Sequence, residues 1–189
     1  MSEFRVVDTA ARSPAGYLTV EDLRVEGPGD ALLERVVVRH PGAAVVVAVE
    51  NDREHTLLVR QWRVALERDM LEVPAGKLDV IGEPPAGAAR RELEEETGFR
   101  AGRLVKLGEF YNSPGFCDEL SYLYCALELE PIGGPHAATD EEAAMTLERV
   151  ALSDVDDLIA SGEIVDAKTI IGLLYTRRFL AGEMAGAEA

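Results

Sequence analysis

Glutamates crowd one short segment of the chain. GKLDVIGEPPAGAARRELEEETGF (76–99) carries Glu92, Glu94, Glu95 and Glu96 within five positions, directly after two arginines. Like charges one helical turn apart destabilise a helix by roughly 0.2–0.5 kcal/mol. Hard divalent cations bind oxygen ligands, and Mg²⁺ commonly takes a few carboxylates together with substrate phosphates. The segment is therefore either a solvated acidic helix or a cation-binding face.

The spacing predicts a helix over residues 85–97. Proline at residue 85 suits the first helical position, and glycine at residue 98 suits the left-handed residue past the end. At 100° per residue, Glu92, Glu95 and Glu96 share one face. Glu94 falls on the other side and is expected to pair with Arg90 one turn back.

Charge and composition restrict the classes of function that are open to the protein. The 189 residues suffice for one good core, and a formal net charge of −16 repels a nucleic-acid backbone, so nucleic acid is excluded as a partner. A phosphate substrate would need metal cations between itself and these carboxylates. We find no membrane-spanning run and no signal-peptide layout, and we interpret Cys117 and Cys125 as free thiols. A cytoplasmic protein is expected.

The elements that must position the glutamates are strands and a few helices. GYLTVEDLRVEG (16–27) and ALLERVVVRH (31–40) predict a small antiparallel β unit around GPGD. Further helices are expected over about 154–161, with Ser153 as N-cap, and over 166–181, before a loose tail. These elements predict a sheet flanked by helices, in a fold of mixed α/β or α+β type. Its expected strands are 42–50, 55–63, 103–110, 120–129 and 146–151.

The glutamate segment resembles the Nudix box. Glu83 is followed by seven residues and then by Arg91-Glu92-Leu93-x-Glu95-Glu96-x-Gly98-Phe99. The box reads glycine, five residues, glutamate, seven residues, R-E-U-x-E-E-x-G-U, where U is aliphatic or aromatic. Here KLDVIG places six residues before Glu83, so the role of this acid is left open. The resemblance implies a Nudix-type α/β/α sandwich with a mixed sheet over 42–189, preceded by a β unit over 1–41 that forms a homodimer.

Two flanking segments resemble the ADP-ribose pyrophosphatase branch. These are LEVPAGKLD (71–79) and NSPGFCDE (112–119), in which Pro114 follows Gly98 by sixteen residues. The resemblance implies Mg²⁺-dependent hydrolysis of ADP-ribose to AMP and ribose 5-phosphate, with Mn²⁺ as a possible substitute. The open alternatives are another nucleoside diphosphate derivative (a nucleotide sugar, NADH or coenzyme A) and a module that binds a nucleotide without hydrolysing it.

The resemblance also implies a metal site. Glu92 and Glu96 are the expected main ligands, Glu95 assists, and the backbone carbonyl of Ala75 adds a further ligand. Arg91, one turn before Glu95, is expected to orient a carboxylate.

The catalytic base is expected in the acidic loop GGPHAATDEEAAMT (133–146), with Glu142 first and Glu141 next. A merely solvated loop is the alternative. The three histidines fall in no motif, and His40 and His55 are interpreted as surface or turn residues. No serine or cysteine has a recognisable base partner, which disfavours covalent catalysis.

Four residues are expected to contact substrate. Arg63 resembles the family's phosphate-binding arginine, Glu72 and Glu119 resemble acids that hold the terminal ribose, and Pro114 marks the substrate loop. Trp62 either stacks on substrate or, as we favour, packs in the core.

Overall fold

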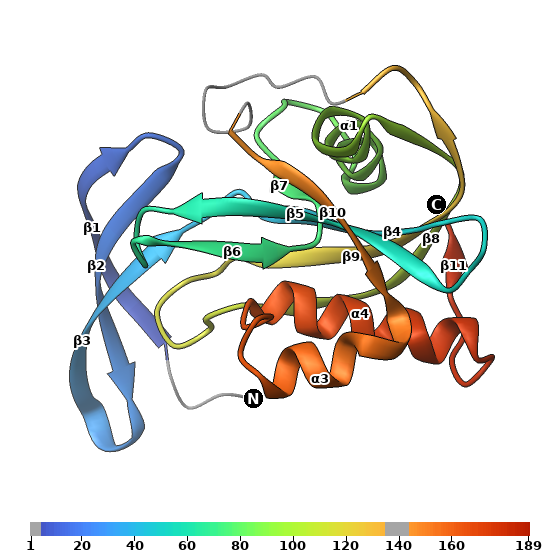
Figure 1. Cartoon of the computed structure of the whole chain (residues 1–189). Coiled ribbons are helices and arrows are strands. Elements are labelled where there is room, and N and C mark those ends of the chain that lie inside the picture. The colour runs from blue at the N-terminus through green and yellow to red at the C-terminus, as the bar shows by residue number, and fades with distance from the viewer. Residues whose placement is uncertain (1–4, 135–143) are drawn as a thin grey trace. The chain divides into compact units, whose positions relative to one another are not determined.

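The structure, a computed structural model, describes residues 5–134 and 144–189. The chain separates into two compact units (Figure 1). The N-terminal unit runs through Gly42 and also includes Tyr111–Leu120. The second unit consists of Ala43–Phe110 and Ser121–Ala189. The segment 111–120 thus packs with the N-terminal sheet. The expected boundary between residues 41 and 42 places this segment in the second domain.

The N-terminal unit is a three-stranded antiparallel sheet in the order β1-β2-β3. Its strands are Arg5–Ala15, Leu18–Gly27 and Ala31–Arg39, so the two extended pieces expected from the sequence are present. The turn between β2 and β3 contains Gly29 at a φ of 68°, a conformation that glycine adopts without strain. Segment 111–120 attaches to β3 through a bridge between Val38 and Cys117 and an ion pair between Arg39 and Asp118 at 3.0 Å.

The second unit is built on a mixed sheet in the order β10-β5-β4-β9-β8-β11, with β6 paired to β5 and β7 to β4. Strands β4 and β9 run parallel, whereas β4 is antiparallel to β5 and β7. The short strands β6, β7 and β11 were not predicted. The bounds are β4 Ala43–Val49, β5 His55–Arg63, β6 Arg68–Glu72, β7 Ala75–Lys77, β8 Phe99–Tyr111, β9 Leu120–Pro131, β10 Thr146–Ala151 and β11 Ala187–Glu188.

Strand β4 is buried along its whole length. Because successive side chains of a strand point to opposite faces, its residues divide between two apolar layers. Val45 and Val47 join the layer that contains Leu173, whereas Ala44 and Val46 join the layer that contains Leu93.

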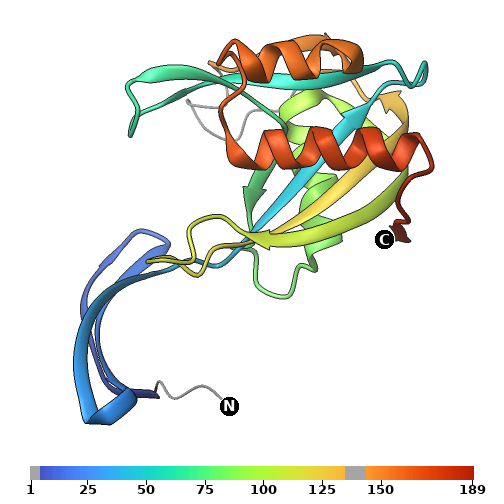
Figure 2. The ribbon, with the colours of Figure 1, turned by 90° about the horizontal axis from the view of Figure 1, so that it is seen from below.

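Helices cover both faces of this sheet, which confirms the α/β/α sandwich. Helix α1 (Pro85–Thr97) lies on one face, and α3 (Val155–Ala160) and α4 (Ala167–Leu180) lie on the other (Figures 1 and 2). Helix α1 begins and ends as predicted, with Gly98 left-handed at a φ of 74°. Ser153 is not the N-cap of the next helix, because Leu152–Asp154 forms a separate 3₁₀ turn that delays the start of α3.

The C-terminal tail is not loose. Strand β11 pairs with β8, the Ala189 amide donates to the Leu104 carbonyl at 3.1 Å, and Arg103 forms an ion pair with Glu188. A Cβ on Gly186 would overlap the side chain of Val105, so glycine allows the tail to approach the sheet. No helix within residues 5–134 and 144–189 combines the length and apolar character needed to cross a membrane.

Candidate active site

The glutamates of α1 divide between two sides of the helix as predicted. Glu92 and Glu96 are only 8% and 9% exposed, although they are acids. The neighbouring stripe, including the fully buried Leu93, packs against the sheet. Glu94 points elsewhere and binds Arg100, with Nε 2.7 Å from Oε1. This ion pair holds the pKa of Glu94 below its usual range.

The predicted ion pair between Arg90 and Glu94 is wrong. Arg90 instead donates to the backbone carbonyls of Ala101, at 3.0 Å, and Ala189, at 3.3 Å. Helical spacing brings residues 90 and 94 close, but Arg100, on the strand that follows α1, offers Glu94 a pair of hydrogen bonds.

Arg91 forms ion pairs with three carboxylates around it. Its guanidinium lies 3.1 Å from Glu83, 2.6 Å from Glu92 and 3.0 Å from Glu95. Burial opposes its charge, but Glu83 and the other two carboxylates outweigh that effect and raise the pKa of Arg91. The extra residue in KLDVIG therefore does not prevent Glu83 from reaching the helix, where it helps to hold Arg91.

Strand β7, which contains the first glycine of the box, lies directly against the glutamate face. The Ala75 amide donates to Oε2 of Glu96 at 3.2 Å. A Cβ on Gly76 would overlap the carboxylate of Glu92. The fold thus gathers the backbone of β7 and the carboxylates of two buried acids. Such an oxygen-rich group fits a hard divalent cation better than a soft one.

Arg63 and Glu72, predicted to bind different parts of a substrate, bind one another. Nε and Nη2 of Arg63 each lie 2.7 Å from a carboxylate oxygen of Glu72, which is 2% exposed. Glu72, with further negative charge from Asp166 and Glu96, raises the pKa of Arg63. A bidentate pair of this kind fixes the orientation of both side chains.

The remaining predicted site residues belong to the N-terminal unit or fall outside the described residues. Pro114 and Glu119 belong to the N-terminal unit, in which Pro114 follows Ser113 at the start of a turn closed by the Cys117 amide and the Ser113 carbonyl at 2.9 Å. Glu141 and Glu142 lie outside the described residues.

Trp62 is 55% exposed, so our preference for a core position is wrong. It lies on β5 one residue before Arg63, near the strand's exposed end. His40 packs edge-on against Tyr17, and His55 pairs with Asp52 at the turn after β4, at 2.8 Å. These positions agree with the interpretation of both histidines as surface or turn residues.

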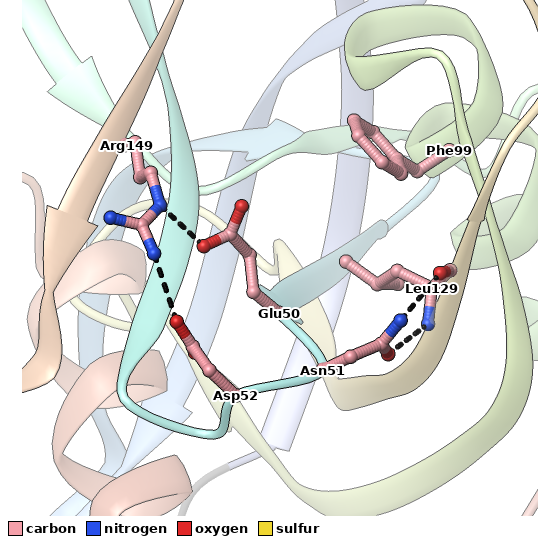
Figure 3. Close-up of a pocket in the computed structure, with 6 residues that line it drawn as sticks. All are labelled: Glu50, Asn51, Asp52, Phe99, Leu129 and Arg149. Atoms are coloured by element: carbon pink, nitrogen blue, oxygen red, sulfur yellow. Dashed lines mark hydrogen bonds and ion pairs between the residues drawn. The ribbon is translucent and has the colours of Figure 1, made fainter.

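A pocket of about 300 Å³ is lined by residues that were not predicted as site residues (Figure 3). Arg149 of β10 lies between Glu50 and Asp52, at 2.6 and 2.8 Å. Glu50, Asp52 and His55 are near enough to share a cation, with ligand atoms within 4.8 Å of one another. Arg149 already balances both carboxylates, and bonds from the Glu54 amide and from His55 lower the pKa of Asp52 to about 2. We interpret the cluster as an ion-pair network that ties the β4–β5 turn to β10.

Comparison with known proteins points to one family and includes close relatives. The chain is 43% identical to an ADP-ribose pyrophosphatase of Bacillus subtilis (strain 168), over 84% of this chain and 83% of the relative. It is 40% identical to a methanol dehydrogenase activator of Bacillus methanolicus, over 84% and 83%. It is 34% identical to an ADP-ribose pyrophosphatase of Mycobacterium tuberculosis (strain ATCC 25618 / H37Rv), over 95% and 86%.

The fold is also found among solved structures. A crystal structure of an ADP compounds hydrolase superposes with a TM-score of 0.82, at 24% identity, over 97% of each chain. At that identity the likeness concerns the fold. The family model described as the NUDIX domain matches residues 39–170, a range that includes the glutamate helix, β7 and the pair of Arg63 and Glu72. The chain belongs to the NUDIX domain family.

Proposed function

We propose that this protein is a metal-dependent pyrophosphohydrolase that cleaves ADP-ribose to AMP and ribose 5-phosphate. The observation that carries the proposal is the burial of Glu92 and Glu96 against the backbone of Ala75 and Gly76. Similarity to two ADP-ribose pyrophosphatases, at 43% and 34% identity, supports the choice of substrate.

Mg²⁺ is the proposed cofactor, and Mn²⁺ is a possible substitute. Glu92 and Glu96 would hold the metal, with Glu95 and the Ala75 carbonyl as further ligands. When bound, the metal neutralises phosphate oxygens and promotes attack by water on phosphorus. A chain with a formal net charge of −16 needs such a cation to bring a diphosphate to its carboxylates.

Arg91 is proposed to orient the ligands rather than to contact the substrate. It holds Glu92 and Glu95 from one side while Glu83 holds it from the other. Groups that fix metal ligands in this way commonly change affinity or activity by about 10–100-fold when they are removed.

Arg63 is proposed to contact the diphosphate. Its Nε and Nη2 hold Glu72, whereas Nη1 carries two further N–H groups. Glu72 is proposed to accept hydrogen bonds from the terminal ribose. The family resemblance implies the same role for Glu119 and a substrate-binding loop that includes Pro114. On this proposal, the ion pair between Arg63 and Glu72 is the arrangement before substrate binds. Bound substrate would then replace some of the hydrogen bonds between these two side chains.

Glu142 is the proposed general base, and Glu141 is the next candidate. A carboxylate can accept a proton from the attacking water or position that water. Both assignments rest on the family resemblance, and both residues lie outside the described residues.

We also propose that the protein is a homodimer formed through the N-terminal β unit. It is proposed to act in the cytoplasm on a small molecule, and not on nucleic acid or a membrane. The β1–β3 sheet exposes large apolar side chains, namely Val7, Leu32 and Val36, at 42–59%. Apolar groups gathered on one small sheet favour association. Sedimentation equilibrium of the full chain tests this, and a monomer at micromolar concentration contradicts it.

A substrate panel tests the activity. Purified protein with Mg²⁺ is given ADP-ribose, GDP-mannose, NADH and coenzyme A, and the mononucleotide released is measured, with EDTA as the metal-free control. We expect AMP from ADP-ribose at the highest kcat/KM and no turnover in EDTA. A tenfold preference for another substrate overturns the ADP-ribose assignment. Absence of turnover on every substrate favours a nucleotide-binding module.

A further inference from the structure

The connection between β6 and β7 leads directly into Ala75, and elements on both faces of the sheet hold it. Val73 and Pro74 form this connection, and Ala75 is the first residue of β7. Three hydrogen bonds of residues 73–75 join the Val73 amide to Oγ1 of Thr169 at 3.0 Å, the Val46 amide to the Pro74 carbonyl at 2.9 Å, and the Ala75 amide to Oε2 of Glu96 at 3.2 Å. Helix α4, strand β4 and helix α1 therefore determine together where the Ala75 carbonyl lies.

Thr169 contributes the bond from the far side of the sheet. Its side chain is fully buried, and its hydroxyl accepts from the Val73 amide while it donates to Oδ2 of Asp166 at 2.8 Å. A hydroxyl has one proton, so donation to Asp166 leaves its lone pairs for Val73. Asp166 is itself held by the Thr169 amide at 2.9 Å and by Lys168 at 2.8 Å.

Within the described residues, a second buried threonine on α4 lacks the hydrogen bonds that Thr169 makes. A buried threonine on this helix therefore does not need such bonds in order to pack. Thr176 is also fully buried, seven residues later. Its hydroxyl has no hydrogen bond of ordinary geometry within the part of the chain that the structure describes, although the Cys125 thiol is within its reach. Thr176 fills space in the core, whereas Thr169 holds a backbone segment from another part of the chain.

We propose that Thr169, oriented by Asp166, is a positioning residue for the metal site. It draws Val73 toward α4 and so holds the Ala75 carbonyl and Gly76 against the face of Glu92 and Glu96. The inference rests on the proposed function, because it takes these groups as metal ligands. Without the hydroxyl, the buried Val73 amide loses its acceptor, and the connection moves to find another.

Three variants of the full chain test the proposal. Thr169→Val keeps the shape of the side chain and removes the hydroxyl, and Thr169→Ser keeps the hydroxyl. Thr176→Val makes the same change on the same helix, away from the connection. Mn²⁺ affinity is measured by electron paramagnetic resonance without substrate, and amide hydrogen exchange is measured at Val73 and Ala75. Thermal unfolding checks that each variant is folded.

We expect Thr169→Val to bind Mn²⁺ about tenfold more weakly, as for other groups that orient metal ligands. Exchange at Val73 and Ala75 should be faster in this variant. Thr169→Ser and Thr176→Val should match the wild type in both measurements. Wild-type Mn²⁺ affinity in Thr169→Val, or an equal loss in Thr176→Val, overturns the proposal. If the wild type binds Mn²⁺ but releases no AMP from ADP-ribose, the proposed substrate fails, while the Mn²⁺ comparison still decides the role of Thr169.

Discussion

Gly76 of β7 lies so close to Glu92 of α1 that a Cβ atom at position 76 would overlap the Glu92 carboxylate. Nothing in the helix itself demands this contact. The two residues meet because β7 pairs with β4, while α1 packs on the face of β4 that carries Ala44 and Val46. The backbone of one element and the carboxylate of the other thus share a space that no larger residue could enter without moving one of them.

Gly76→Ala is therefore expected to displace the Glu92 carboxylate while the fold survives, because the overlapped atoms are the end of a flexible side chain. We expect turnover to fall by about 10²-fold and Mn²⁺ affinity to fall with it, since a shift of about 1 Å in a site of this kind has such effects. AMP release and a Mn²⁺ titration measure the two effects. Unchanged turnover with an unchanged melting temperature would mean that Glu92 is not a ligand.

Glu96→Gln and Glu94→Gln test the division of the helix into two sides. The first change alters a buried acid bonded to the Ala75 amide, and turnover should fall at least about a hundredfold, more than for groups that merely orient ligands. The second removes only the charge of an ion pair with Arg100 and should alter unfolding free energy by less than about 1 kcal/mol and turnover by less than about twofold. Equal losses of turnover in the two variants would refute this assignment of faces.

Arg91→Lys should lower turnover by roughly 10–100-fold, because a lysine ammonium cannot hold Glu83, Glu92 and Glu95 at once in a planar fork. Arg90→Lys is the matched control on the neighbouring residue, whose contacts are backbone carbonyls. Steady-state kinetics over a range of Mg²⁺ concentrations compare the two. Similar kinetics in both variants would mean that the Arg91 contacts do not orient the ligands.

Glu142→Gln should lower kcat by about 10²-fold or more while Mn²⁺ affinity stays near that of the wild type, because a general base acts on water and not on the metal. Glu141→Gln, on the adjacent residue, is the control and should retain most of its kcat. Pre-steady-state measurement of AMP formation reads the chemical step directly. If the larger loss occurs in Glu141→Gln, the base is Glu141.

Asp166 should make stability depend on pH below the ordinary carboxyl range. Burial opposes its ionisation, but Lys168 and the Thr169 amide and hydroxyl outweigh that effect, so the pKa of Asp166 lies below its usual 3.8. A lowered folded-state pKa means that the stabilisation is present above the unfolded-state value and is lost as pH falls through the folded-state value.

The measurement is the free energy of unfolding of the wild type and of Asp166→Asn between pH 5 and about pH 2.5. Asparagine can still accept from the Thr169 amide as an N-cap, but it does not titrate. We expect the free energy of unfolding of the wild type to fall by more than that of the variant over this range, because residue 166 titrates only in the wild type. Parallel pH dependences would show that Asp166 does not contribute.

The sequence by itself determined the glutamate helix, the face that Glu92 and Glu96 share, and the family. These features depend on residues within a few turns of one another, where proline, glycine and helical periodicity act locally. The same holds for most of the strands, including β5 and β10, which begin and end as predicted, because their apolar runs are bounded by turn residues.

Only the tertiary structure decided which distant groups meet. It paired Arg63 with Glu72, directed Glu94 to Arg100, laid β7 against Glu92, and joined Val73 to Thr169 across 96 positions. It also drew the tail into the sheet as β11. Such contacts depend on how whole elements pack, and several partners of suitable charge compete for each side chain in a chain with 35 acidic and 19 basic residues. Helical spacing offered Arg90 as a partner for Glu94, and packing selected Arg100.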